Sequence, residues 1–336
     1  MTDHRSDMAR EIGETAEACG RQVEANGPLM RELGARLRQS SPPFVATVAR
    51  GSSDHAASFA KVLFELRCAT PTLSHAPSVG ALYQATSPRF AGVPLLAISQ
   101  SGRSPDLIAA ADDARRSGAL QIALVNDTSS PLAQHSDLVI PLHAGAERSV
   151  AATKTFIATL VALTHLAAEW SEDAALLSAV RDIGDTLARQ EPGAWMHAGP
   201  ALRDAERLLV LGRGYTLPIA AEAALKLKEV AGLHAEAFSI AEVAHGPMTL
   251  VGSGDPVLVF APVDAAREGL DARLADFADR GATVISRCPA SAPDFDPAVA
   301  AIVDIIGFYR CAEAVARARG RNPDLPPHLA KVTRTL

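Results

Sequence analysis

Residues 207–230 read RLLVLGRGYTLPIAAEAALKLKEV: an apolar run, a glycine turn and then a helical pattern. The run from Arg207 to Leu211 predicts a strand, and the turn after it opens a helix of about five turns. Residues three, four and seven positions apart lie on one side of a helix. Glu222, Lys226 and Glu229 therefore share a face, which is either a solvated charge stripe or a functional site.

The chain repeats this layout at an offset of 163 residues. Residues 45–48 fall on 208–211, and the Arg-Gly pair at 50–51 falls on the pair at 213–214. Two unrelated β-α-β layouts could coincide in this way. A duplicated α/β domain explains the single ungapped offset better.

The repeat also predicts the environment of the charged face. Positions 222, 226 and 229 fall on Phe59, Leu63 and Leu66, an apolar stripe typical of a helix face that packs on a core. We therefore expect the charged face to point inward as well. Buried charges are costly unless they are paired, so an inward Glu-Lys-Glu set indicates a structural ion-pair network or a catalytic cluster.

Strand-like and helical patterns alternate along most of the chain, which is typical of parallel sheets with helices on both faces. The sequence thus predicts an α/β fold of two tandem doubly wound parallel-sheet domains, each with three αβα layers. Residues 3–39 predict two helices that break at Gly27-Pro28, and residues 151–190 predict a long helical segment that breaks near Ser171.

A second candidate site is the loop 99–105, which reads SQSGRSP and follows a predicted buried strand. Gly102 permits a tight turn, and Ser104 and Pro105 are placed as the N-cap and first residue of a helix. Hydroxyls, an amide and backbone N–H groups at a helix N-terminus favour an anion such as phosphate. An ordinary turn that caps a helix is the alternative. The P-loop pattern is absent, so nucleotide hydrolysis is not expected.

The matching loop of the second half, 262–267, has lost the serines. One half would then hold the phosphate, and the other half would supply the charged helix.

Composition restricts the partners. The net charge of -6 gives no electrostatic reason for nucleic-acid binding, and the four cysteines form no C-x-x-C pair that would suggest a zinc site. The N-terminus is polar, unlike a signal peptide. The most apolar long run, 151–168, contains Lys154 and His165, which argues against a membrane span. We expect a cytoplasmic protein with no nucleic-acid or membrane partner and with its thiols reduced in the core.

His245 and Lys331 are weaker candidates. His245 precedes Gly246-Pro247, so its ring lies on a loop or helix end, where a structural role is as common as a catalytic one. Lys331 lies in a proline-containing tail that, taken alone, reads as a frayed basic end.

Several strings are specific enough to identify a family. They are the charged helix from Glu222 to Glu229, GSS at 51–53, SQSG at 99–102, VAATK at 150–154, LGRG at 211–214, HAEA at 234–237, HGP at 245–247 and LAKVT at 329–333. Over residues 20–336 the chain resembles the sugar isomerase (SIS) family. It is most similar to the isomerase half of the glutamine–fructose-6-phosphate amidotransferases, the glucosamine-6-phosphate synthases.

The resemblance implies a role for each matching residue. Glu229 would be the base that moves a proton between C1 and C2 of the sugar, and Lys226 and Glu222 would assist it. His245 would open the sugar ring from a partner subunit, and Lys331 would lie in a tail that closes over the site. The 6-phosphate would be held by Ser99, Gln100, Ser101 and Ser104, and the sugar by Gly51, Ser53, Val150 and Ala151.

Three departures from the family pattern bear on the substrate. Thr2 stands where a glutaminase would have its nucleophilic cysteine, so we expect no glutamine hydrolysis and no ammonia delivery. Arg103 and Ser104 replace an acidic residue and a threonine, and Arg103 would add a cation near the phosphate. Ala152 replaces a serine, which removes one donor to the sugar.

The resemblance therefore implies a phosphosugar isomerase and deaminase that converts glucosamine 6-phosphate to fructose 6-phosphate and ammonia. It would need no metal or other cofactor and would act as a homodimer with shared active sites. A deglycase or aldose–ketose isomerase on another 6-phosphosugar derivative stays open. So does a non-catalytic sugar-phosphate sensor, although the chain lacks room for an added DNA-binding domain before its first predicted strand.

The expected organisation has five parts. They are N-terminal helices at 1–40, a first SIS domain with the phosphate-binding loop at 41–170, a helical linker at 171–200, a second SIS domain with the catalytic helix at 201–322, and a C-terminal active-site tail at 323–336.

Overall fold

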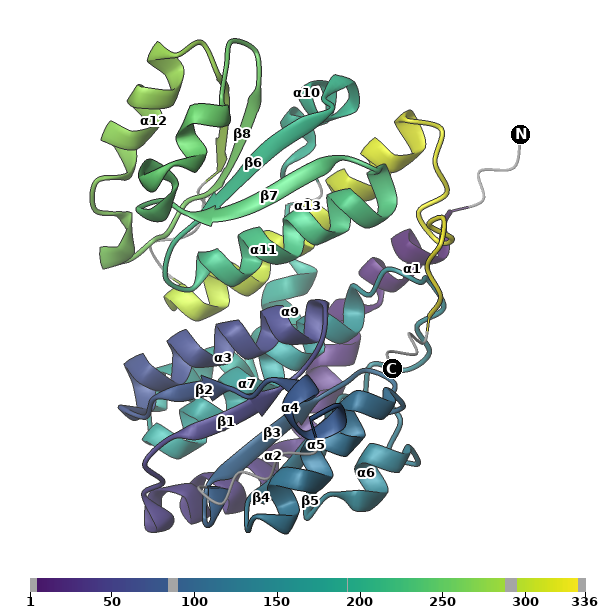
Figure 1. The fold of residues 1–336 in the computed structure, drawn as a ribbon, viewed down its shortest axis with the longest axis vertical. Coiled ribbons are helices and arrows are strands. Elements are labelled where there is room, and N and C mark those ends of the chain that lie inside the picture. The colour runs from purple at the N-terminus through teal and green to yellow at the C-terminus, as the bar shows by residue number, and fades with distance from the viewer. Residues whose placement is uncertain (1–4, 84–89, 192, 288–294, 332–336) are drawn as a thin grey trace. The chain divides into compact units, whose positions relative to one another are not determined.

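The computed structural model describes residues 5–83, 90–191, 193–287 and 295–331 (Figure 1). Two sequence-based expectations fall outside these residues: the core thiol of Cys288 and the part of the tail at 332–336. By its internal contacts the chain divides into two compact units. The serine-loop unit contains residues 15–147, 154–185 and 330–336; the charged-helix unit contains residues 1–14, 148–153 and 186–329.

The serine-loop unit is built on a five-stranded parallel sheet with the strand order β2-β1-β3-β4-β5. Its central strands β1 and β3 are buried at every position, as expected for a parallel sheet covered on both faces. The elements in chain order are α2 (Thr15–Ser40), β1 (Val45–Val48), α3 (Ser52–Cys68), β2 (Thr72–Ser74), α4 (Pro77–Ala81), β3 (Pro94–Ile98), α5 (Pro105–Arg116), β4 (Leu120–Val125), α6 (Pro131–His135), β5 (Leu138–Pro141), α7 (Lys154–Ser171) and α8 (Ala174–Arg181).

Small and branched side chains fill the layers of this unit. Ala46 of β1, Leu95 of β3 and Ala123 of β4 form a buried cluster with residues of α5 and α6. Helices α2 and α3 both pack against α7 in the opposite layer (Figure 1). The strand order reverses between β1 and β3, and sheets of this order bind ligands at the carboxyl ends of those two strands.

The charged-helix unit is built on a four-stranded parallel sheet with the strand order β7-β6-β8-β9. Leu211 of β6 and Val259 of β8 form a core with Phe277 of α12. The helices and strands in chain order are α1 (Asp7–Gly13), α10 (Gly199–Asp204), β6 (Arg207–Gly212), α11 (Thr216–Lys226), a π-turn (Leu227–Ala231), β7 (His234–Ser239), β8 (Pro256–Phe260), α12 (Leu270–Asp279), β9 (Thr283–Arg287) and α13 (Pro297–Ala318); α9 (Ile183–Ala188) crosses the boundary between the units.

The two sheets follow the sequence repeat. Shifted by 163 residues, strands β1 to β4 begin within one residue of β6 to β9. The predicted fold class, two tandem doubly wound parallel-sheet α/β domains, is confirmed.

The predicted break at Gly27-Pro28 is wrong, because α2 runs through Pro28 and the boundary with α1 lies at Glu14. Proline removes one internal hydrogen bond from a helix, but packing can outweigh that loss. The buried side of α2 lies along α7, where Gln22 Nε2 donates a hydrogen bond of 2.9 Å to the carbonyl of Ala158. The break near Ser171 is confirmed, since α7 ends at that residue.

No helix in the described ranges combines the length and the apolar character that crossing a membrane would require.

Candidate active site

The charged helix does not keep α-helical geometry to its end. α11 gives way to the π-turn, which ends at Gly232 with a φ of 64°. A π-turn carries wider i to i+5 hydrogen bonds and frequently occurs at functional sites. Glu229 lies in this turn, whereas Glu222 and Lys226 lie in the regular helix. The sequence pattern did not predict this change of geometry.

The three charged side chains form one chain of contacts. Lys226 Nζ lies 3.6 Å from Glu222 Oε1 and donates a short hydrogen bond to Glu229 Oε2. The side chains of Glu222 and Lys226 are 0% and 1% exposed, and that of Glu229 is 20% exposed. This chain of contacts therefore begins in the interior at Glu222 and ends at the partly exposed carboxylate of Glu229. A general base must be accessible to its substrate, and Glu229 meets that requirement.

Two of the three apolar positions that match the charged face are buried, as the repeat predicted. Phe59 and Leu63 are fully buried, but Leu66 is 64% exposed, so the prediction that the whole stripe faces the core is wrong. An α-helix drifts by about 20° over seven residues, and Leu66 lies in the last turn of α3. Glu229, at the matching position, is likewise the most exposed member of its set.

Tyr309 extends the chain of contacts into the core. Its hydroxyl donates a hydrogen bond of 3.0 Å to Glu222 Oε1, and the residue is 1% exposed. The phenol helps to satisfy a carboxylate that has no access to water. Tyr309 was not among the predicted site residues, because a tyrosine within the apolar pattern of α13 looks like an ordinary core residue.

Tyr309→Phe is expected to lower the melting temperature, because it removes this donor and keeps the ring. A buried polar group that loses its partner costs about 1–3 kcal/mol. Thermal unfolding monitored by circular dichroism would measure the change. Tyr83→Phe is the matched control, since Tyr83 is 78% exposed. Equal melting temperatures for the two variants would contradict the assigned role of Tyr309.

The serine loop, residues 99–104, leaves the carboxyl end of β3 and enters α5. Ser99 Oγ accepts a hydrogen bond of 3.1 Å from Gly102 N, and Ser101 Oγ accepts one of 3.4 Å from Arg103 N. Gly102 has a φ of 61°, which favours glycine. The two hydroxyls thus help to hold the turn.

Other donors at this edge have no hydrogen-bond partner among the described residues. The side chains of Ser53, Gln100 and Ser104 form no hydrogen bond with another residue in the described part of the chain. Ser104 is the N-cap residue of α5 as predicted, but its hydroxyl makes no cap bond. Ser53 lies in the first turn of α3, after the exposed Gly51, whose φ is 55°. β1 and β3 are neighbours, so both helix N-termini lie at one sheet edge, which suits an anion.

Two ion pairs set the charge beside these loops. Arg50 binds the buried carboxylate of Asp106 through Nε at 3.0 Å and Nη2 at 2.9 Å, which neutralises an acidic group in the first turn of α5. Arg103 Nη2 lies 2.8 Å from Asp127 Oδ2. Hydrogen bonds from Ser129 and Arg103 lower the pKa of Asp127. Asp127 therefore offsets the charge of Arg103, and the expected contribution of Arg103 to phosphate binding stays a prediction.

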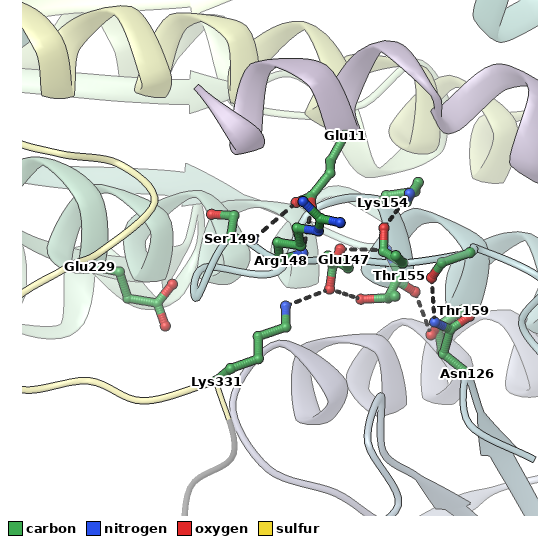
Figure 2. A network of polar contacts seen from close by, with 12 residues as sticks. Glu11, Asn126, Glu147, Arg148, Ser149, Lys154, Thr155, Thr159, Glu229 and Lys331 are labelled. Carbon is green, nitrogen blue, oxygen red and sulfur yellow. Dashed lines mark hydrogen bonds and ion pairs between the residues drawn. The ribbon is translucent and has the colours of Figure 1, made fainter. Parts of the chain in front are cut away.

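Val150 and Ala151 lie in the segment 148–153 of the charged-helix unit. Val150 N donates a hydrogen bond of 3.1 Å to the carbonyl of Asp324. The buried carboxylate of Glu11 accepts hydrogen bonds from the backbone of Arg148 and Ser149, the latter at 3.4 Å (Figure 2). The backbone of this segment is thus fixed from both termini of the chain.

The remaining two candidates have different surroundings. His245 ends a short 3-10 turn and is exposed, and its imidazole forms no hydrogen bond or ion pair with the other described residues. Lys331 Nζ lies 2.9 Å from Glu147 Oε2 (Figure 2). The roles given to both residues stay predictions. Within the described ranges, no group of three or more histidines, cysteines and carboxylates is placed to hold a metal.

Two doubly wound parallel sheets, one with two helix N-termini at the same edge and the other beside a helix that carries a carboxylate–lysine chain, define a duplicated α/β protein. The family model of the SIS domain matches residues 42–169 and 201–291. The chain belongs to the SIS family, as the sequence motifs predicted, and its relatives include phosphosugar isomerases.

Individual relatives agree with this assignment. A crystal structure from Silicibacter pomeroyi DSS-3, provisionally named a phosphosugar isomerase, is 40% identical, with a TM-score of 0.88 over 95% of this chain and 100% of that one. The glutamine–fructose-6-phosphate aminotransferase [isomerizing] of Thermococcus kodakarensis is 30% identical over 96% of this chain and 57% of the relative. That of Pyrobaculum aerophilum is 37% identical over 70% of this chain and 42% of the relative. The chain therefore spans about half the length of these curated relatives.

A glucosamine-6-phosphate deaminase from Thermotoga maritima has the same fold. It is 21% identical, with a TM-score of 0.82 over 98% of this chain and 100% of that one.

Proposed function

We propose that this protein is an enzyme that converts glucosamine 6-phosphate and water to fructose 6-phosphate and ammonia. The observation that carries the proposal is the Glu222–Lys226–Glu229 chain, in which a partly exposed carboxylate is backed by a buried lysine and a second carboxylate. Movement of a proton between adjacent carbons of a sugar requires such a positioned base. The names of the relatives add fructose 6-phosphate and glucosamine 6-phosphate as the sugars to test.

The proposed reaction proceeds on the open-chain amino sugar. Glu229 takes the proton from C2, and the same proton or one from solvent is returned to C1. O1 gains a proton and the amino nitrogen loses one, so the product carries a hydroxyl at C1 and an imine at C2. Water then converts the imine to a ketone with release of ammonia. His245 opens the ring, and Lys226 and Glu222 support the base.

Substrate binding is divided among the loops. The serine loop holds the 6-phosphate, Gly51 and Ser53 contribute at the neighbouring strand end, and the segment with Val150 and Ala151 holds the sugar. The unused donors of Ser53, Gln100 and Ser104 support this assignment.

A panel of hexosamine and ketohexose 6-phosphates, scored separately for ammonia and for ketose, tests the proposal. Ammonia and fructose 6-phosphate in equal amounts from glucosamine 6-phosphate would support it. Ketose without ammonia would point to an isomerase or deglycase, and binding without turnover would point to a sensor. Glucosamine without its phosphate is the control, and it is expected to react poorly.

We further propose a homodimer in which His245 acts in the site of the partner. The imidazole is exposed and has no hydrogen bond or ion pair with the residues that the structure describes, which supports this arrangement. A mixture of His245→Ala and Glu229→Gln proteins is then expected to recover part of the activity that each lacks alone. No recovery at any ratio, with dimers present by light scattering, would argue for a self-contained subunit.

A further inference from the structure

A buried ion pair fixes the last described residue of the chain. Lys331 Nζ lies 2.9 Å from Glu147 Oε2, and both residues belong to the serine-loop unit (Figure 2). The Glu147 side chain is 0% exposed and that of Lys331 is 25% exposed. Exposed ion pairs contribute little to stability, but a carboxylate that is removed from water destabilises the protein unless nearby groups compensate its charge.

The same carboxylate caps the N-terminus of α7. Glu147 Oε1 accepts a hydrogen bond of 3.0 Å from Thr155 N, and Oε2 accepts one of 2.7 Å from Thr155 Oγ1. The first N–H groups of a helix have no partner within the helix, and a carboxylate there also favours the helix dipole. Glu147 is therefore held in place by α7, independently of Lys331.

These hydrogen bonds also close a loop. Glu147 directly precedes residues 148–154, and Thr155 directly follows them. The loop contains Val150 and Ala151, which the proposed function assigns to the sugar. One carboxylate thus joins the base of this loop to the lysine of the C-terminal tail (Figure 2).

The charge state of Glu147 agrees with this geometry. Burial alone raises the pKa of Glu147, but the charge of Lys331 and the hydrogen bonds from Thr155 outweigh it and lower the pKa below its usual value. The carboxylate is therefore ionised at neutral pH, and an ammonium beside it is favoured.

We propose that Glu147 is a positioning residue that seats the C-terminal tail through Lys331 and couples this seat to the base of the loop 148–154. The inference rests on the proposed function, which assigns the segment with Val150 and Ala151 to the sugar. Glu147 acts through Lys331 and Thr155, not on the sugar itself.

Hydrogen exchange measured by mass spectrometry tests the seat without any assay of activity. Glu147→Gln is expected to accelerate exchange in the peptide that ends at residue 331, and Lys331→Ala is expected to do the same. The double variant should exchange no faster than the faster single variant. Lys61→Ala is the matched control, because Lys61 is an exposed lysine of the same unit outside this network, and it should leave the tail close to wild type. Unchanged exchange in Glu147→Gln would overturn the inference.

Steady-state kinetics, measured with the substrate that the panel of sugar phosphates identifies, test the coupling between the tail and the loop. Glu147→Gln and Lys331→Ala are each expected to lower kcat/KM by about tenfold, and the double variant by no more than the larger single effect, as for residues of one network. Multiplied losses would mean that the residues act independently and would overturn the inference. Glu147→Asp, which keeps the charge, should recover part of the loss.

The two proposals can fail separately. If the wild-type protein acts on no sugar phosphate, the proposed function fails, while the exchange experiment still decides whether Glu147 seats the tail. If Glu147→Gln does not fold, Lys331→Ala carries the exchange test alone, because its side chain is partly exposed. Wild-type exchange of the tail in that variant would then overturn the inference.

Discussion

Glu229→Gln is expected to lower kcat by about 10²- to 10⁴-fold, the usual contribution of a positioned general base. The amide keeps the size of the side chain and can still accept a hydrogen bond from Lys226, so the fold and substrate binding should change little. Only the ability to take a proton from C2 is lost. Steady-state kinetics and calorimetric titration with the substrate would separate turnover from binding.

Glu206→Gln is the matched control, since Glu206 is an exposed carboxylate of the same unit that is not in the charged helix. Transfer of hydrogen between solvent and the sugar at C1 and C2 gives an independent readout, and it should disappear only in Glu229→Gln. Normal turnover in that variant would show that another group is the base.

Gly102→Ala is expected to weaken binding of any phosphorylated sugar by roughly 5- to 30-fold, because a left-handed backbone costs other residues about 1–2 kcal/mol. A Cβ atom at Gly102 would also lie 2.1 Å from Ser130 Oγ and 2.6 Å from Ser130 Cβ, so the serine loop would have to move. KM, affinity for inorganic phosphate and melting temperature would all be measured.

Gly92→Ala separates the two effects. Gly92 has a φ of 75° in the same unit, but a Cβ atom there would meet nothing within 4 Å. It should lower the melting temperature modestly and leave phosphate affinity unchanged. Equal phosphate affinities for the two variants would show that the geometry of the serine loop does not govern anion binding.

The fold was predictable because its signals are local and repeated. Alternating strand and helix patterns gave the α/β class, and one offset of 163 residues aligned four strands of each sheet. The predicted helix break at Pro28 was wrong because only the local loss of a hydrogen bond at proline can be read from the sequence. The packing of α2 along α7, which outweighs that loss, involves residues far apart in the sequence. The prediction that Leu66 is buried was wrong because a periodic pattern alone does not show where a helix leaves the core.

The candidate site was predictable only where its chemistry lies in a continuous motif. The charged helix and the serine loop stand out as strings, but Tyr309 and Glu147 do not. They contact Glu222 and Lys331 across 87 and 184 residues of sequence. The pairing of Arg103 with Asp127 is equally non-local, and the π-turn at Glu229 leaves no mark in a pattern of residue types.

The division of the chain into units has a consequence for synthesis. The serine-loop unit includes Lys331, and the charged-helix unit includes the first fourteen residues. During translation, most of the first sheet therefore emerges from the ribosome long before the segment with Lys331, which binds Glu147, is made. Until residue 331 has been translated, that carboxylate lacks its ammonium partner, and the nascent first half should be protected by chaperones or remain more open to proteases than the finished unit.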